Sequence, residues 1–268
     1  MNTLYIKRAD TSIIYDPDAK GPVSLMVGDI RVRGEYKTKS SLSPELLSLL
    51  LSGLKPEYKK WDYENINFSY IKDKIIPLYS SFDSAHQIDH VKAVMHDSIE
   101  EAKDLGVSET LSLVAAAYHD IGLVKDRKTH HLVSGEMMRK DEFLNSTFPP
   151  DIVSLLAEAA EDHRASSSTI PHSIFGAIVA DSDRQLETET VIMRTIQYSM
   201  SHGAENLDQV KAHVFSHMAE KYSKNGYLST FFPSEKDKCN ILQLHSLSEN
   251  EKLLSEIVEK LWSKVENF

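Results

Sequence analysis

Histidine and aspartate occur together in the middle of the chain, where they could bind a metal ion. His119 and Asp120 are adjacent at the end of the apolar stretch AAAYHDIG, and most of the twelve histidines lie between residues 86 and 217. Imidazole and carboxylate ligands suit Mn, Fe, Co, Ni, Zn or Mg. Burying such polar groups is costly unless something compensates them. A divalent cation would do so, and it would also lower the pKa of a bound water toward neutrality.

The apolar periodicity around these residues predicts helices. Over 86 to 105, apolar residues recur at three- and four-residue steps until Gly106, and His86 and His90 share one face of that helix. The next helix begins after Ser108, a good N-cap residue, and its LVAAAY stretch is apolar all round. We therefore expect a buried helix that ends on the adjacent histidine and aspartate.

Two further predicted helices carry candidate ligands near their C-terminal ends. A helix that starts at the Pro149-Pro150 pair places His163 on its apolar stripe. The segment from 172 to 186 ends in two acids, Asp181 and Asp183. Residues two apart on a helix point to different sides, so at most one of them is expected to face a given site.

The first 60 residues differ in character from the rest. LYIKR, TSIIY and PVSLMVGDIRVRG are β-rich, which predicts a small β element, and residues 41–54 have the pattern of a helix. We expect an N-terminal extension over 1–60 and a helical domain over 61–268 that ends in a helical tail. Further along the chain, His213 and His217 are four apart, which indicates a partly exposed helix face.

Composition excludes several classes of function. The formal net charge of -10 argues against nucleic-acid binding, which depends on clustered Lys and Arg. No apolar stretch approaches the ~20 residues that a membrane span needs. The N-terminus lacks the pattern of a secretory signal, and Cys239 is the single cysteine, so a cytoplasmic location is expected.

Five motifs in this order resemble those of the HD-domain superfamily of metal-dependent phosphohydrolases. They are AHQIDHVKAV (85–94), AAAYHDIG (115–122), HHLVSGE (130–136), EDHRASS (161–167) and VADSDRQL (179–186). The resemblance covers roughly residues 80 to 220 and implies a mainly α fold, an HD-domain helical bundle, to which the short β-containing extension is added. It also implies a divalent metal cofactor of one or two ions.

Carried onto this sequence, the resemblance implies a set of metal ligands: His90, His119, Asp120 and Asp183. Asp183 is preferred because the last ligand of the family tends to stand directly before Arg or Lys, and Asp181 is the alternative. His131 and His163 stand where binuclear members hold a second ion. Either histidine could instead be an ordinary hydrogen-bonded residue of the core or the surface.

The same resemblance suggests which residues contact the substrate. DSDR is similar to the DADR of small bacterial members that cleave nucleotides, in which a lysine often follows the HD pair, as Lys125 does here. Lys125, Arg164 and Arg184 are candidates for phosphate binding by charge. His86 is a candidate for a phosphate or supporting contact, so the catalytic set would be Asp120, Lys125 and His86. The GYP signature of cyclic-dinucleotide phosphodiesterases is absent.

The function implied is metal-dependent hydrolysis of a phosphoester or phosphoanhydride in a small phosphorylated molecule, with a nucleotide preferred. Two alternatives stay open. A diiron HD-type oxygenase would use His131 and His163 as additional ligands, and a non-catalytic module would keep the metal for binding or sensing. The sequence also leaves open a homo-oligomer.

Overall fold

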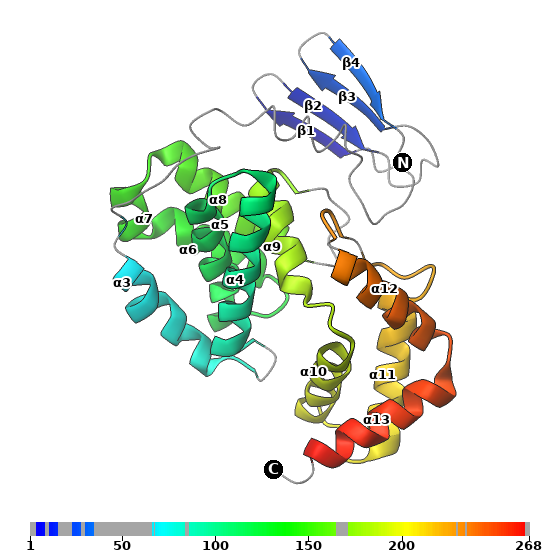
Figure 1. Ribbon diagram of the computed structural model, residues 1–268. Helices are drawn as coiled ribbons and strands as arrows, with labels where there is room; N and C mark the ends of the chain where they lie inside the picture. The colour runs from blue at the N-terminus through cyan, green and yellow to red at the C-terminus, as the bar shows by residue number, and fades with distance from the viewer. Residues whose placement is uncertain are drawn as a thin grey trace.

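The computed structural model describes the strand residues 4–8, 11–15, 23–27 and 30–34, together with residues 66, 68–83, 86–164, 171–228, 230–233 and 235–265. The predicted helix over 41–54 lies outside the described residues. The described part of the chain is mainly helical, which confirms the fold class that the sequence predicts (Figure 1).

Four short strands lie near the N-terminus. They are β1 (Leu4–Arg8), β2 (Thr11–Tyr15), β3 (Val23–Val27) and β4 (Ile30–Gly34). They form one antiparallel sheet in the order β1-β2-β3-β4, with Leu4 opposite Tyr15 and Val27 opposite Ile30. The strands lie within the segments that the sequence marks as β-rich.

A first group of helices forms around α5 (Glu109–Tyr118). It consists of α3 (Phe68–Tyr70), the π-helix η1 (Ile71–Ile75), the 3-10 helices η2 (Ile76–Ser81) and η3 (Ile121–Val124), and the helices α4 (Ile88–Leu105), α6 (His130–Lys140), α7 (Glu142–Thr147), α8 (Pro150–Asp162) and α9 (Ile174–Arg184). Helices α4, α8 and α9 all pack on α5.

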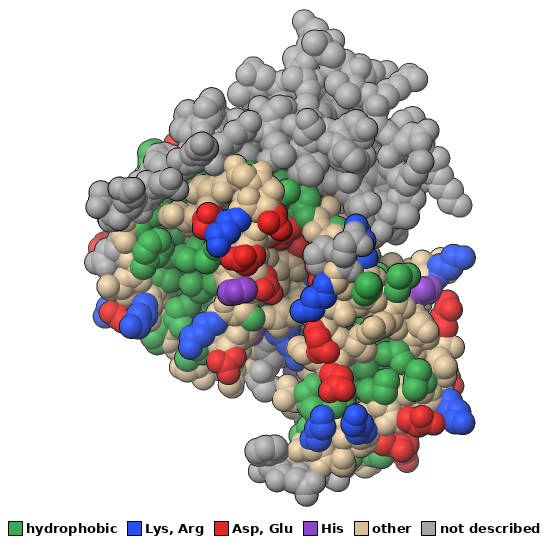
Figure 2. Space-filling view, in the orientation of Figure 1, with side chains coloured by type: hydrophobic (Ala, Val, Ile, Leu, Met, Phe, Trp, Pro, Cys, Tyr) green, Lys and Arg blue, Asp and Glu red, His purple; other side chains and the backbone are tan. Residues whose placement is uncertain are grey.

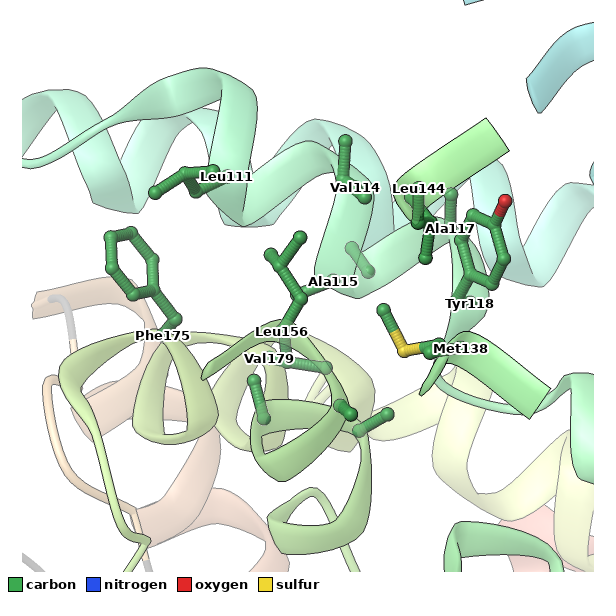
Figure 3. Close-up of a cluster of buried hydrophobic side chains, with 14 of the residues drawn as sticks. Leu111, Val114, Ala115, Ala117, Tyr118, Met138, Leu144, Leu156, Phe175 and Val179 are labelled. Atoms are coloured by element: carbon green, nitrogen blue, oxygen red, sulfur yellow. The ribbon is translucent and has the colours of Figure 1, made fainter. Parts of the chain in front are cut away.

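Helix α5 is central because apolar residues surround it on every side. Its Leu111 and Val114 are fully buried, and so are Leu156 of α8 and Phe175 of α9 (Figure 3). Burying each large apolar side chain contributes about 1.5–3 kcal/mol to folding, so these contacts fix the helix firmly. The chain that leaves the end of α5 therefore starts from a rigid support.

The predicted end of α4 and the predicted start of α5 are both confirmed. Helix α4 ends at Gly106, whose φ of 67° is the left-handed conformation that glycine adopts readily. Ser108 caps α5, because its side chain accepts a hydrogen bond of 3.2 Å from the backbone N–H of Leu111.

A second group of helices follows α9. It consists of α10 (Thr188–Ser201), α11 (Leu207–Tyr222), α12 (Glu235–Ser248) and α13 (Glu251–Val265), which lie together in Figure 1. Ile192, Val214, Leu244 and Val258 are fully buried among them, in a hydrophobic cluster separate from the one around α5. These four helices thus have a hydrophobic core of their own.

The described helices have solvent-facing surfaces of mixed charge. None of them is both long and apolar enough to cross a membrane. On the face shown in Figure 2, acidic and basic side chains are intermixed. A site lined mainly by basic side chains would therefore differ from this mixed surface.

Candidate metal centre

Four side chains that the sequence singles out come together in the first helical group. His90 lies in the first turn of α4, His119 follows α5, Asp120 precedes η3 and Asp183 lies near the end of α9. One potential ligand atom of each lies within 4.8 Å of those of the other three. The first three residues are buried, and Asp183 is partly exposed. The fold thus brings ligands from distant parts of the sequence to one point.

The backbone fixes the orientation of His119. Its Nδ1 lies 2.7 Å from the carbonyl oxygen of Ala116, so Nδ1 carries the proton and donates it. The lone pair of a neutral ring then lies on Nε2, which is 3.3 Å from Asp120 Oδ2 and 3.7 Å from Asp183 Oδ1. Hydrogen bonds of this kind hold metal-binding histidines in one tautomer and one orientation.

The buried Tyr79 holds the backbone of Asp120 in place. The Tyr79 hydroxyl accepts a hydrogen bond of 3.2 Å from the backbone N–H of Asp120 and donates one of 3.0 Å to the carbonyl of Ala117. Burial raises the pKa of the Tyr79 hydroxyl well above its ordinary value, so it stays protonated and can donate. This contact anchors the chain where it turns from α5 into η3.

The two acids at the end of α9 have different environments. Asp183 Oδ1 is 3.1 Å from His90 Nε2, which places it in the centre. Asp181 instead accepts hydrogen bonds from the backbone N–H groups of Phe231 and Phe232, at 2.7 and 2.6 Å from its Oδ2. Asp183 is therefore the acid beside the histidines, and Asp181 stabilises the loop before α12.

A second group of potential ligands shares Asp120 with the first. Asp120 Oδ1 lies 3.2 Å from His130 Nε2 and 3.3 Å from His163 Nε2. The Nδ1 atoms of these two histidines bond to the carbonyl oxygens of Arg127 and Ala160, at 2.6 Å each. Both Nε2 atoms therefore face Asp120, whose two oxygens point to different histidine groups. Asp120, His130 and His163 could therefore hold a metal ion of their own.

The structure brings His130 into this second group, whereas the sequence comparison pointed to His131. The two residues begin α6, and neighbours on a helix diverge by about 100°. Only one of them can therefore face Asp120. His131 lies on another side of α6, where burial lowers its pKa to about 4.

A close backbone contact sets the position of His130. A Cβ atom added to Gly122 would lie 2.1 Å from the carbonyl oxygen of His130, so only glycine allows η3 and α6 to approach so closely. The Gly122 N–H also donates a hydrogen bond of 2.9 Å to the Ser134 hydroxyl. The role of Gly122 is thus to admit α6 beside the centre.

The charges of the centre favour a bound cation. Burial lowers the pKa of His119, but the carboxylates of Asp120 and Asp183 outweigh burial and raise that pKa to about 10. Burial raises the pKa of Asp120, yet the surrounding histidines, His119 above all, bring it well below its ordinary value. The two carboxylates therefore stay ionised and attract positive charge.

The donor atoms fit a divalent metal ion. His119 Nε2 is buried and has no hydrogen-bond partner among the described residues, and an unpaired buried polar atom is costly. Nitrogen and oxygen donors without thiolate are the ligand set of the first-row metals and of Mg. The His and Asp cluster is thus able to hold a metal ion.

Arg194 of α10 contacts His90 from outside the centre. Its Nη2 lies 2.9 Å from His90 Nδ1, and a guanidinium can only donate, so Nδ1 accepts and a neutral ring carries its proton on Nε2. Ligation through Nε2 would place that proton on Nδ1 instead. The hydrogen bond from Arg194 and metal binding by His90 therefore exclude each other.

A cavity of about 540 Å³ opens beside the centre and is lined by the end of α9 and by residues of α10 and α11. Among the described residues that line it, Asp183 is the one acid, whereas five are Arg or Lys. These are Arg127, Arg164, Arg184, Arg194 and Lys221. His213 and His217, expected on a partly exposed helix face, also line this cavity.

Three of the four residues predicted to contact substrate lie at this cavity. Arg164, Arg184 and His86 line it, and His86 Nδ1 is 2.7 Å from Asp83 Oδ1. Lys125 is exposed at the end of η3 and is not among the lining residues. The 3-10 turn carries the chain past the centre before Lys125 is reached, so the structure gives this lysine no place beside the cavity.

Three residues at the centre were not predicted. His130 is adjacent to His131, which was predicted. Tyr79 lies before the first of the five sequence motifs, and Arg194 lies after the last of them. The four-residue spacing of His213, His217 and Lys221 could have indicated a shared binding face, because it puts all three side chains on one face of α11.

Part of the chain matches a known protein family. Residues 88–185 match the HD domain family. The chain is also similar in structure to a predicted HD superfamily hydrolase from an uncultured Thermotogales bacterium, with 22% sequence identity and a TM-score of 0.43. That similarity covers 57% of this chain and 87% of the other. Comparison with curated proteins gives no significant match.

Proposed function

We propose that the protein is a metal-dependent phosphohydrolase that acts on a small phosphorylated molecule, with a nucleotide as the preferred class. The observation that carries this proposal is the position of Asp120, whose two oxygens face separate groups of histidine Nε2 atoms beside a basic cavity. The HD domain match supports a hydrolase of this family.

The ligands would be His90, His119, Asp120 and Asp183 for one ion, and Asp120, His130 and His163 for a second. A divalent ion held there would polarise a phosphoryl oxygen and lower the pKa of water. The fold supplies ionised carboxylates, fixed imidazoles and a rigid support for them.

The residues around the centre have separate tasks in this proposal. The arginines and the lysine of the cavity offset the negative charge of the phosphate. His86 lines the cavity and is hydrogen-bonded to Asp83, so it is placed to exchange a proton with the substrate. Lys125 has no task here because it lies outside the cavity lining.

The test is release of phosphate from a panel of phosphomonoesters, nucleotides and phosphoanhydrides by the full-length protein loaded with Mn²⁺. The Asp120→Ala variant should lose at least about a hundredfold in kcat/KM, because metal-ion catalysis contributes several kcal/mol. Asp104→Ala, which removes an exposed acid of α4, is the matched control and should keep full activity. Equal activity of the two variants would refute the proposal.

The second histidine group also favours a second candidate, a diiron oxygenase, because that chemistry needs two ions at one site. The protein loaded with iron would then consume dioxygen in the presence of a small organic substrate. Phosphate release without oxygen consumption, from the same preparation, would decide for the hydrolase.

A further inference from the structure

The cavity beside the metal centre is far more basic than the rest of the molecule. The chain as a whole carries a formal net charge of -10, yet the cavity is lined by five Arg and Lys residues and one acid. Walls of one sign around a recessed site concentrate the field and attract ions of the opposite sign. The lining therefore selects for anions.

Two of the five basic lining residues come from outside the HD domain match. The family match ends at residue 185, whereas Arg194 belongs to α10 and Lys221 to α11. Helices α10 and α11 belong to the C-terminal group, which has its own hydrophobic core. The C-terminal group therefore adds a binding wall to a site whose metal ligands all lie in the first group.

Among the lining residues, Lys221 indicates an anionic ligand most clearly. Its Nζ lies 5.2 Å from the centre of the Tyr222 ring, and among the described residues no carboxylate lies within ion-pair distance of it. Burial, helped by repulsion from Arg184, lowers the pKa of Lys221 to about 8. A half-buried ammonium without an acid partner has lost part of its hydration, and an anion in the cavity would offset that loss.

Other basic groups of the lining already have contacts that hold them in place. Arg127 pairs with Asp83, and its guanidinium lies 5.0 Å from the centre of the Tyr198 ring. Arg164 donates a hydrogen bond of 2.7 Å to the carbonyl of Lys128. Their side chains are thus oriented before a ligand arrives, which reduces the entropy cost of binding.

The metal centre and this wall share the same cavity. Asp183 belongs to the centre and to the lining, and Arg194 reaches from the lining to His90 at 2.9 Å. A molecule with one phosphate at the centre would therefore extend past Arg194 toward Lys221.

We propose that the C-terminal helical group makes the enzyme specific for substrates with at least two phosphate groups, binding the phosphate that does not react through Arg194 and Lys221. This assignment rests on the proposed function for the position of the reacting phosphate. The binding site itself can be tested without turnover.

The test is calorimetric titration of the full-length, metal-loaded protein with imidodiphosphate, whose bridging nitrogen resists hydrolysis. The Lys221→Met variant removes the charge and keeps the length of the side chain. It should bind imidodiphosphate at least about tenfold more weakly, because a hydrogen bond to a charged group contributes about 1.5–3 kcal/mol. Lys224→Met, which removes an exposed charge just after α11, should bind as the wild type does.

Stability separates loss of binding from loss of folding. Since burial disfavours the charged form of Lys221, the Lys221→Met protein should unfold at a temperature no lower than the wild type at pH 7. Wild-type affinity in that variant, or no binding by the wild type, would overturn the proposal. Binding that depends on Lys221 in a protein without hydrolase activity would instead refute the proposed function and leave this site intact.

Discussion

The Nε2 atoms of His130 and His163 lie 3.1 Å apart in the second ligand group. Each ring bonds through Nδ1 to a backbone carbonyl, so in the neutral tautomers neither Nε2 carries a proton. Two lone pairs at this distance repel each other unless a cation or a proton lies near them. The contact therefore marks a second position for positive charge next to Asp120.

The first prediction concerns how many metal ions the protein binds. The wild type should hold two ions per chain, and His130→Ala should hold one, because the second group would keep only Asp120 and His163. Elemental analysis of the dialysed, metal-loaded proteins gives the stoichiometry directly.

The neighbouring residue provides the control for this prediction. His131→Ala removes the same side chain one position along α6, on a side that does not face Asp120, and it should still hold two ions. Loss of an ion in the His131 variant, with two ions kept in the His130 variant, would reverse the assignment.

This pair of residues also shows where the sequence stops being informative. The ligands of the first group follow strong helix signals, such as the apolar LVAAAY stretch before His119 and the cap at Ser108, so their convergence could be expected. The rotation of α6 depends instead on its close contact with Gly122, a tertiary feature. A one-residue difference in that rotation exchanges His130 for His131.

The basic cavity could not be predicted for a related reason. Its lining combines side chains of the first helical group with Arg194 and Lys221 of the second, and only the packing of the two groups brings them together. Lys125, by contrast, is close to His119 in sequence and yet exposed beyond η3. Proximity in sequence to a ligand does not establish proximity in space.

The second prediction follows from the competition for His90. Because the hydrogen bond from Arg194 to Nδ1 excludes ligation through Nε2, Arg194→Met should bind metal about fivefold more tightly than the wild type, which corresponds to one hydrogen bond of about 1 kcal/mol. Competition with a fluorescent metal chelator measures this affinity.

Arg164→Met is the matched control, since it removes an arginine of the same cavity whose hydrogen bond goes to the Lys128 carbonyl and not to His90. It accounts for the general effect of one positive charge less near the ion. A weaker metal affinity in the Arg194 variant would show instead that this arginine orients His90 for binding.

The third prediction concerns stability at acid pH and involves His217. Burial lowers the pKa of this imidazole to about 4, and Lys221 and His213 add to the effect, whereas Glu220 opposes it. The unfolded chain, with an ordinary histidine pKa of about 6.5, binds the proton more readily than the folded protein does. Folding stability that is present above pH 6.5 is therefore lost as the pH falls toward 4.

Replacing His217 with Gln should remove that loss. Between pH 7 and pH 4, the free energy of unfolding measured with urea should fall by about 2 kcal/mol less in the variant than in the wild type, after allowance for the partial exposure of the side chain. His96→Gln changes an exposed histidine of α4 and should follow the wild-type curve at every pH. Parallel curves for all three proteins would mean that His217 is solvated in the folded state, and the wall formed by α11 would then be more open than the cavity requires.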